Sequence, residues 1–152
     1  MKNLQIRKAT ADDSEFAYQT KKAAFREYAE KVWGWDEDEQ RKLHQRRFAV
    51  HDFRVIQVAG TDVGIMAMER KPDCINLHQL FILPEYQERG IGEAVMKLLI
   101  NESAGAKLPI RLQVLKVNNR ALTFYQRLGF KRTGESETHI LMERVSDRAQ
   151  LY

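Results

Sequence analysis

The sequence of 152 residues contains one cysteine, Cys74, so no disulfide can form within the chain and a disulfide-held scaffold is excluded. Glycine and proline are scarce, with 8 and 3 residues, which excludes collagen-like and linker-rich chains. The longest uninterrupted apolar run is four residues, too short to span a membrane. A chain of this length buries roughly 68–70% of its unfolded surface. We therefore expect one domain over residues 1–152.

Charge of one sign is also lacking. The 25 lysines and arginines against 21 acidic residues leave a net charge of +4, and the basic residues are spread along the whole chain. This balance suits an anionic ligand and argues against a nucleic-acid-binding protein. The first ten residues lack the apolar core of a signal peptide. The four histidines and Cys74 show no metal-ligand spacing. We expect a cytoplasmic protein with no metal, no nucleic acid and no membrane partner.

Hydrophobic periodicity predicts the element order β-α-α-β-β-β-α-β-α-β-β. The expected strands cover residues 4–9, 53–58, 63–69, 75–83, 110–117, 130–133 and 138–145. The first two helices lie between Thr10 and Gly34 and between Asp36 and Arg47. The third carries a predicted apolar face of Ile91, Ala94, Val95, Leu98 and Leu99, and the fourth ends at Gly129. Helices between strands favour parallel pairing after Leu83, and hairpins favour antiparallel pairing elsewhere, so the sheet should be mixed.

One segment has the chemistry of an anion site. Residues 87–92 read Gln-Glu-Arg-Gly-Ile-Gly and open the third helix directly after a strand. The first amides of a helix lack intrahelical acceptors and carry a partial positive charge, and glycines let a phosphate approach the backbone. The segment is not an NTPase P-loop, because the sequence lacks Gly-x-x-x-x-Gly-Lys-Ser/Thr, and it is not a Rossmann fingerprint, because Val95 occupies the third glycine position. A tight turn without ligand is the alternative.

The residues around this segment carry a resemblance. Leu80 to Gly92 reads as an apolar strand, then Pro-Glu-Tyr, then Gln-x-x-Gly-x-Gly, and closely resembles the acetyl-coenzyme A signature of the GNAT superfamily of N-acetyltransferases. A second block, Asn118 to Phe130, resembles the family's downstream segment, in which an asparagine precedes a helix with Ala and Tyr and the sequence Leu-Gly-Phe follows. The likeness to the family is strong from Leu80 to Phe130 and weak before Phe53.

The resemblance implies an α/β (mixed α+β) fold: a mostly antiparallel sheet of about seven strands, splayed between the fourth and fifth, with about four helices. It implies acetyl-CoA as co-substrate and no metal. The backbone of Leu80, Phe81 and Ile82 would bind the pantetheine arm and polarise the thioester. Asn118 would also contact that arm, unless it is only a turn residue. The implied pyrophosphate site comprises Gln87, Glu88, Arg89, Gly90, Ile91, Gly92 and Glu93, of which Arg89 is equally consistent with a solvated side chain.

The implied catalytic acid is Tyr125, which would protonate the departing thiolate; a phenol with a pKa near 10 keeps its proton at neutral pH. A core aromatic is the alternative. The amine must lose a proton before attack, yet the places where some family members carry a glutamate hold His78, Gln79 and Gln113. Glu69, His78 and a water chain without a single base remain open as the base.

Trp33 and Trp35 are expected to wall the acceptor site, because aromatic faces bind cations; the alternative is a core role. The expected function is transfer of the acetyl group of acetyl-CoA to a primary amine, by direct attack in a ternary complex. A non-catalytic sensor of coenzyme A or acyl-CoA is the alternative. The acceptor is a small-molecule amine or a protein amine. Dimers are common in the family, so a homodimer is a further expectation.

Overall fold

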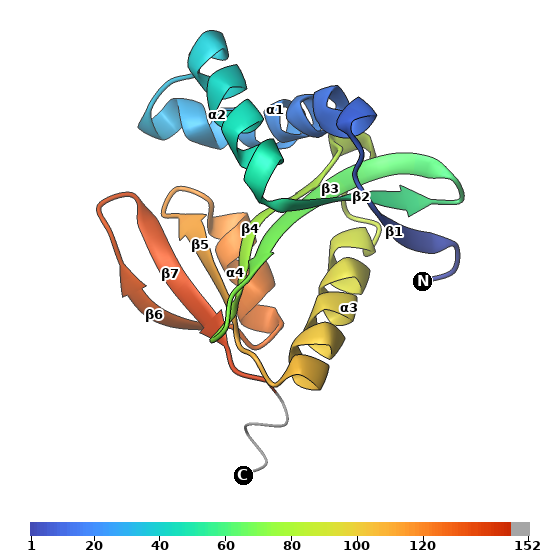
Figure 1. Cartoon of the computed structure of the whole chain (residues 1–152). Coiled ribbons are helices and arrows are strands. Elements are labelled where there is room, and N and C mark those ends of the chain that lie inside the picture. Colours follow the sequence, from blue (N-terminus) through green and yellow to red (C-terminus); the bar gives the residue numbers. More distant parts are fainter. Residues whose placement is uncertain (147–152) are drawn as a thin grey trace. The chain divides into compact units, whose positions relative to one another are not determined.

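A computed structural model describes residues 1–146 (Figure 1). The strands are β1 (Leu4–Lys8), β2 (Asp52–Val58), β3 (Thr61–Arg70), β4 (Ile75–Ile82), β5 (Ile110–Leu115), β6 (Lys131–Glu135) and β7 (His139–Arg144). The helices are α1 (Ser14–Val32), α2 (Glu37–Val50), α3 (Ile91–Ala106) and α4 (Asn119–Arg127), with 3-10 turns at Ala11–Asp13 and Pro84–Tyr86. The predicted order of elements is confirmed.

The strands form a seven-stranded sheet in the order β1-β2-β3-β4-β5-β7-β6. The β4–β5 pair is parallel, and its ladder joins Ile75–Leu77 to Ile110–Leu112, whereas β4 continues to Ile82 and β5 to Leu115. The pairs β1–β2, β2–β3, β5–β7 and β6–β7 are antiparallel. The expected mixed, mostly antiparallel sheet is therefore confirmed. Within residues 1–146, no helix is both long and apolar enough to cross a membrane.

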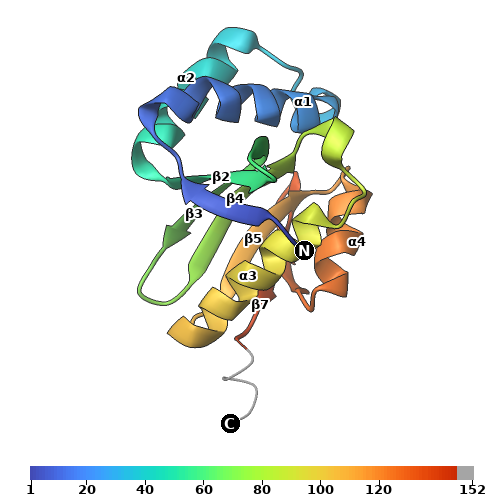
Figure 2. The ribbon, with the colours of Figure 1, turned by 90° about the vertical axis from the view of Figure 1, so that its right-hand side faces the viewer.

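The chain divides into two compact units, and the first comprises residues 1–68 and 79–96. In this unit α1 and α2 lie together over one face of β1, β2 and β3 (Figures 1 and 2). Buried small and apolar side chains fill that interface: Ala17 of α1 packs with Phe53, Ile65 and Ala67, and Phe48 of α2 lies against the same cluster. Ile65 and Ala67 of β3 therefore lie on the face that the helices cover, since alternate residues of a strand point to the same side.

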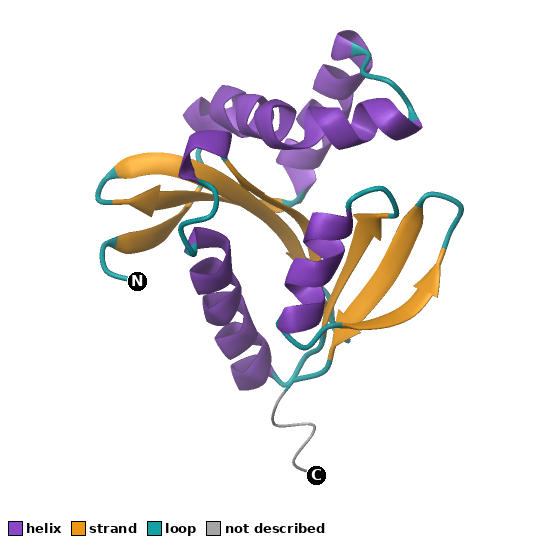
Figure 3. Ribbon diagram, turned by 180° about the vertical axis from the view of Figure 1, so that it is seen from behind, coloured by secondary structure: helices purple, strands orange, loops and turns teal. Residues whose placement is uncertain are grey.

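The second unit comprises residues 69–78 and the chain from 97 onward. In it α4 covers one face of β5, β7 and β6 (Figure 3). Alternate residues of β5 and β7 are buried, among them Ile110, Leu112, Ile140 and Met142. Phe130 follows α4 and is buried as well. Such alternation is typical of strands that are covered on one face.

The predicted apolar face of α3 needs one correction. Leu98 is 49% exposed, whereas Met96, which was not placed on that face, is fully buried. The buried stripe is Ile91, Val95, Met96 and Leu99. Positions i, i+4, i+5 and i+8 still share one side of a helix, so the helix is as expected but rotated relative to the predicted face.

An ion pair fixes the entry into α1. Asp13 is buried and accepts two hydrogen bonds from the guanidinium of Arg7, at 2.8 and 2.9 Å. The same carboxylate accepts the Thr10 amide at 2.8 Å, so one side chain ties β1 to the turn before the helix. These contacts hold the pKa of Asp13 well below its usual range.

We expect Asp13→Asn to lower the free energy of unfolding by about 1–3 kcal/mol at neutral pH, since the amide cannot accept both guanidinium bonds. Because the pKa of Asp13 is depressed in the folded state, its contribution is present above about pH 4 and is lost as the pH falls below that value. Urea unfolding of both proteins at neutral and acidic pH measures this. An unfolding difference that persists unchanged in acid would contradict it.

Candidate functional site

A close backbone contact shapes the end of β4. A Cβ atom placed on Gly64 of β3 would lie 2.6 Å from the Phe81 carbonyl oxygen and 2.8 Å from the Ile82 side chain. A side chain at position 64 is therefore incompatible with the present course of β4. The Leu83 amide donates to the carbonyl of Val63 at 2.9 Å, which holds the strand's exit beside β3. Leu80, Phe81 and Ile82, the residues expected to bind the pantetheine arm, lie on this stretch.

The loop after β4 is fastened back to the strand. The Tyr86 amide donates to the Leu83 carbonyl at 2.9 Å, and the Gln87 side-chain amide donates to the Ile82 carbonyl at 2.8 Å. Glu88 and Gly90 then adopt positive φ angles of 63° and 81°. A side chain at position 90 would be strained by that angle, although the space around it is open. The predicted glycine loop is thus a tight turn with a defined backbone.

The turn ends at the N-terminus of α3. The Ala94 amide donates to the Gly90 carbonyl at 3.1 Å, so Gly90 is the N-cap residue. The amides of Ile91 and Gly92 belong to the first helical turn, where α-helical geometry provides no intrahelical acceptor. An anion placed there would meet backbone donors and the positive end of the helix dipole. The Arg89 guanidinium lies over the Tyr86 ring, 5.4 Å from its centroid, beside this turn.

In the second unit, Asn118 caps α4. Its side-chain oxygen accepts the Ala121 amide at 3.0 Å, and its carbonyl accepts the Leu122 amide at 3.2 Å. Asn118 is therefore the N-cap residue of α4, and its expected contact with the pantetheine arm stays a prediction. In the described chain its side-chain NH₂ group makes no hydrogen bond, which leaves a donor that a ligand carbonyl can use.

Tyr125 lies on α4 and is half-buried. Its ring contacts those of Phe124 and Phe130, at centroid distances of 5.1 and 5.4 Å. Burial raises the pKa of Tyr125 above its ordinary value, so the phenol is protonated at neutral pH. Its carbonyl accepts the Leu128 and Phe130 amides, at 3.0 and 3.1 Å, and so closes the helix. The aromatic and acid interpretations are both compatible with this position.

Two of the candidate bases lie together in the second unit. The His78 Nε2 atom is 2.8 Å from a carboxylate oxygen of Glu69. The side chains are 31% and 38% exposed, so solvent reaches both. A carboxylate bonded to one imidazole nitrogen orients the ring. The structure thus turns two separate candidates into one hydrogen-bonded pair.

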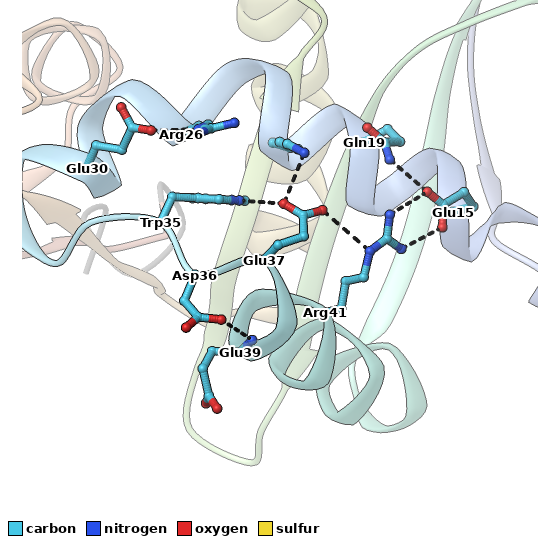
Figure 4. Close-up of polar contacts among 10 residues, drawn as sticks. Glu15, Gln19, Arg26, Glu30, Trp35, Asp36, Glu37, Glu39 and Arg41 are labelled. Carbon is cyan, nitrogen blue, oxygen red and sulfur yellow. Dashed lines mark hydrogen bonds and ion pairs between the residues drawn. The ribbon is translucent and has the colours of Figure 1, made fainter.

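The two tryptophans differ in environment. Trp33 is 57% exposed at the end of α1, and Trp35 is half-buried. The Trp35 indole donates to Glu37 at 2.9 Å, and the same carboxylate lies 3.0 Å from the Lys22 ammonium (Figure 4). Trp35 is therefore tied into the polar contacts between α1 and α2. The role of Trp33 and Trp35 in holding an acceptor stays a prediction.

One residue of this site was not identified in the sequence: Gly64, which sets the course of β4. Gln87 was expected at the pyrophosphate, and its side chain also fastens the loop to the Ile82 carbonyl, a bond that the sequence did not predict. A glycine inside a strand is a recognised sign of close backbone approach, so Gly64 carried a signal. The bond made by Gln87 depends on the loop conformation, so no sequence pattern could have predicted it.

Comparison with known proteins gives consistent matches. A family model described as "Acetyltransferase (GNAT) domain" matches residues 49–132, from the end of α2 into β6. Over 88 residues the chain is 32% identical to an uncharacterised N-acetyltransferase of Methanocaldococcus jannaschii, covering 52% of this chain and 38% of that protein. Over 79 residues it is 33% identical to the N-alpha-acetyltransferase RimI of Mycobacterium tuberculosis, covering 49% of each. The matched part spans less than half of each curated relative.

Among solved structures, the PaiA N-acetyltransferase of Thermoplasma acidophilum, determined in complex with coenzyme A, superposes with a TM-score of 0.74. The match covers 93% of this chain and 98% of that one at 19% sequence identity. At this identity the likeness concerns the fold, and it extends over nearly all of both chains.

We expect Gly64→Ala to reduce the free energy of unfolding by about 1–3 kcal/mol, because the new methyl group forces β3 and the end of β4 apart. Gly105→Ala is the matched control, since nothing lies within 4 Å of a Cβ atom at that helical position. There the substitution should be neutral or stabilise by up to about 1 kcal/mol. Thermal melting of both variants measures the difference. Equal effects at the two positions would contradict the close contact.

Proposed function

The chain belongs to the GNAT acetyltransferase family, and we propose that it transfers the acetyl group of acetyl-CoA to a primary amine. The proposal rests on one observation above all. The loop between β4 and α3 combines a left-handed Gly90 with a helix N-terminus whose first amides have no intrahelical acceptor. Such a turn fits a pyrophosphate, which needs backbone donors and close approach more than side-chain charge.

The cofactor contacts that we propose come from backbone and side chain. Amides from Glu88 to Glu93 bind the pyrophosphate, and the backbone of Leu80 to Ile82 binds the pantetheine arm. Gln87 holds the loop in this conformation through its bond to the Ile82 carbonyl. Asn118 keeps its oxygen on the Ala121 amide and offers its NH₂ group to a carbonyl of the same arm. Coenzyme A bound to the PaiA structure is consistent with this choice of co-substrate.

When bound, acetyl-CoA supplies an acetyl group whose C–S bond breaks as a C–N bond to the amine forms. A backbone amide of β4 polarises the acetyl carbonyl, as donors in an oxyanion hole do. The Glu69–His78 pair accepts the proton that the ammonium must lose, directly or through water, since imidazole is a base suited to neutral pH. Tyr125 gives its phenolic proton to the departing thiolate and then recovers one from solvent.

The name of the Mycobacterium tuberculosis relative describes acetylation of an α-amine. That name supports a primary amine as the acceptor of this chain. A sensor that binds acyl-CoA without turnover remains the second candidate, and it is supported by the absence of a carboxylate at His78, Gln79 and Gln113. Catalysis and binding must therefore be measured separately.

Binding is tested first by thermal melting with acetyl-CoA. At 100-fold excess over its dissociation constant, a ligand adds about 2.7 kcal/mol, which corresponds to a rise in Tm of roughly 5–10 °C for a chain of this size. Gly90→Glu should abolish the shift, because it places a strained, negatively charged side chain at the pyrophosphate site. Gly60→Glu is the matched control, with a φ of 80° and equally open surroundings at the β2–β3 turn. An unshifted wild type, isolated without bound cofactor, would overturn the proposal.

Catalysis is tested by Tyr125→Phe, which keeps the ring contacts with Phe124 and Phe130 and removes only the proton donor. We expect kcat to fall by about 10²–10⁴, the usual contribution of a general acid. The dissociation constant of acetyl-CoA should stay within a few fold, and this serves as the internal control. Steady-state acetylation of an amine panel measures the change. An undiminished kcat would remove Tyr125 from the mechanism, and no turnover by the wild type, with binding intact, would favour the sensor.

A further inference from the structure

The N-terminal residues lie beside the glycine turn of the first unit. Figures 1 and 2 both show the N-terminal end near the beginning of α3. Apart from the chain neighbours of Gly90, a single heavy atom of residues 1–146 lies within 4 Å of a Cβ atom placed on that glycine. It is the terminal methyl carbon of Met1, at 4.0 Å. The Met1 side chain therefore lies on the side of Gly90 where a side chain would project, at ordinary contact distance.

Met1 is held in this position by the residues that follow it. The β1–β2 pairing begins at Leu4, opposite Val58. One residue earlier, the Asn3 carbonyl accepts the Ala59 amide at 3.0 Å, and Asn3 adopts a positive φ of 64°. A left-handed residue changes the direction of the chain, as it does in tight turns. The first two residues therefore leave the edge of the sheet and reach the turn before α3.

The Met1 side chain occupies part of the approach to the proposed pyrophosphate site. The absence of a side chain at Gly90 leaves a volume through which a phosphate reaches the amides of Ile91 and Gly92. The Met1 methyl group borders this same volume. A methyl group accepts no hydrogen bond, so it covers the turn without satisfying the donors there. Phosphate and Met1 therefore compete for space, and only the phosphate gains hydrogen bonds.

Met1 is also unlike the other methionines of the chain. It is 59% exposed, whereas the four others are 0–2% exposed, namely Met66, Met68, Met96 and Met142. Because less than half of the Met1 side chain is covered, its contact contributes only a fraction of the free energy of a fully buried methionine. Such a contact is weak enough to yield to an anion that accepts hydrogen bonds from backbone amides.

We propose that residues 1–3 form a strap that covers the glycine turn in the free protein, and that the pyrophosphate of acetyl-CoA displaces Met1 from Gly90 when it binds. The proposal rests on the proposed acetyl-CoA site and adds a control of cofactor affinity to it. A ligand that binds only the open form has a lower apparent affinity, because part of the protein is in the covered form. The strap therefore weakens acetyl-CoA binding, and its loss should strengthen it.

The first test measures the dissociation constant of acetyl-CoA by titration calorimetry, with wild type and variants all released from the same cleavable N-terminal fusion. In Met1→Ser we expect the dissociation constant to fall about two- to fivefold, the effect of losing one partly buried methionine contact. Met1→Leu keeps an apolar side chain of similar size and should bind as the wild type does. Val50→Ser is the matched control, since it removes a 73% exposed apolar side chain from the end of α2.

The second test observes the strap directly by NMR of protein labelled with ¹³C at the methionine methyl groups. Met1 gives the signal of an exposed methionine, and the four buried methionines serve as internal references. In the free protein we expect a nuclear Overhauser effect between the Met1 methyl group and the α protons of Gly90. Acetyl-CoA should abolish this effect and move the Met1 signal toward that of an unstructured methionine. In Gly90→Glu, which should not bind the cofactor, acetyl-CoA should leave the Met1 signal unchanged.

Three outcomes would overturn the strap while leaving the acetyl-CoA site standing. An unchanged dissociation constant in Met1→Ser would show that the contact has no effect on binding. Weaker binding by Met1→Ser would show that the segment holds the cofactor rather than competing with it. A Met1 methyl signal that stays constant while acetyl-CoA saturates the wild type would show that the side chain is not displaced.

Failure of the proposed function has a different signature. If acetyl-CoA binds but no amine is acetylated, tighter binding by Met1→Ser together with a displaced Met1 signal still supports the strap, since neither measurement depends on turnover. If acetyl-CoA binds neither the wild type nor Met1→Ser, the cofactor site is wrong. The displacement by acetyl-CoA is then overturned with it, even where the Overhauser effect shows that Met1 contacts Gly90 in the free protein.

Discussion

The close approach of β3 to β4 at Gly64 is the constraint on which the first unit depends. The missing side chain lets the Phe81 carbonyl lie where a Cβ atom would be only 2.6 Å away. That contact fixes the end of β4, and Ile82 then offers its carbonyl to the side chain of Gln87. The loop held in this way ends at Gly90, whose carbonyl receives the first helical bond of α3. The proposed cofactor site thus consists of backbone atoms whose positions depend on the contact between β4 and its neighbour β3.

In the second unit, the segment that resembles the family, Asn118 to Phe130, ends a helix and positions a side chain. The Leu-Gly-Phe segment that carries part of the family resemblance ends α4, because the Leu128 and Phe130 amides both donate to the Tyr125 carbonyl. Phe130 is then buried against the Tyr125 ring. The same contacts that end the helix therefore hold the side chain proposed as catalytic acid. Asn118 has a comparable double use, since its oxygen caps α4 while its NH₂ group stays available.

The basic side chains of α1 and α2 differ in their environments. Lys22, Arg26 and Arg41 lie within ion-pair distance of carboxylates, and such exposed pairs contribute little to stability. Lys21 differs from them, because it is 3% exposed and its ammonium donates to the neutral side-chain oxygen of Gln40 at 3.2 Å. The sequence gave no sign of this burial, because a lysine on a helix is usually a surface residue. Its burial depends on the packing of α2 against α1.

The order of elements, the mixed sheet, the position of the glycine turn before α3 and the family could all be predicted from the sequence. Each depends on local rules: periodicity of apolar residues, residues that start and end helices, and motifs such as residues 87–92 that lie within one turn of chain. Tertiary structure alone showed that Leu98 is exposed, that Glu69 meets His78, that Gln87 bonds to Ile82, and that Lys21 is buried without a carboxylate. These features join residues on different elements or depend on the conformation of a loop, so no local pattern encodes them.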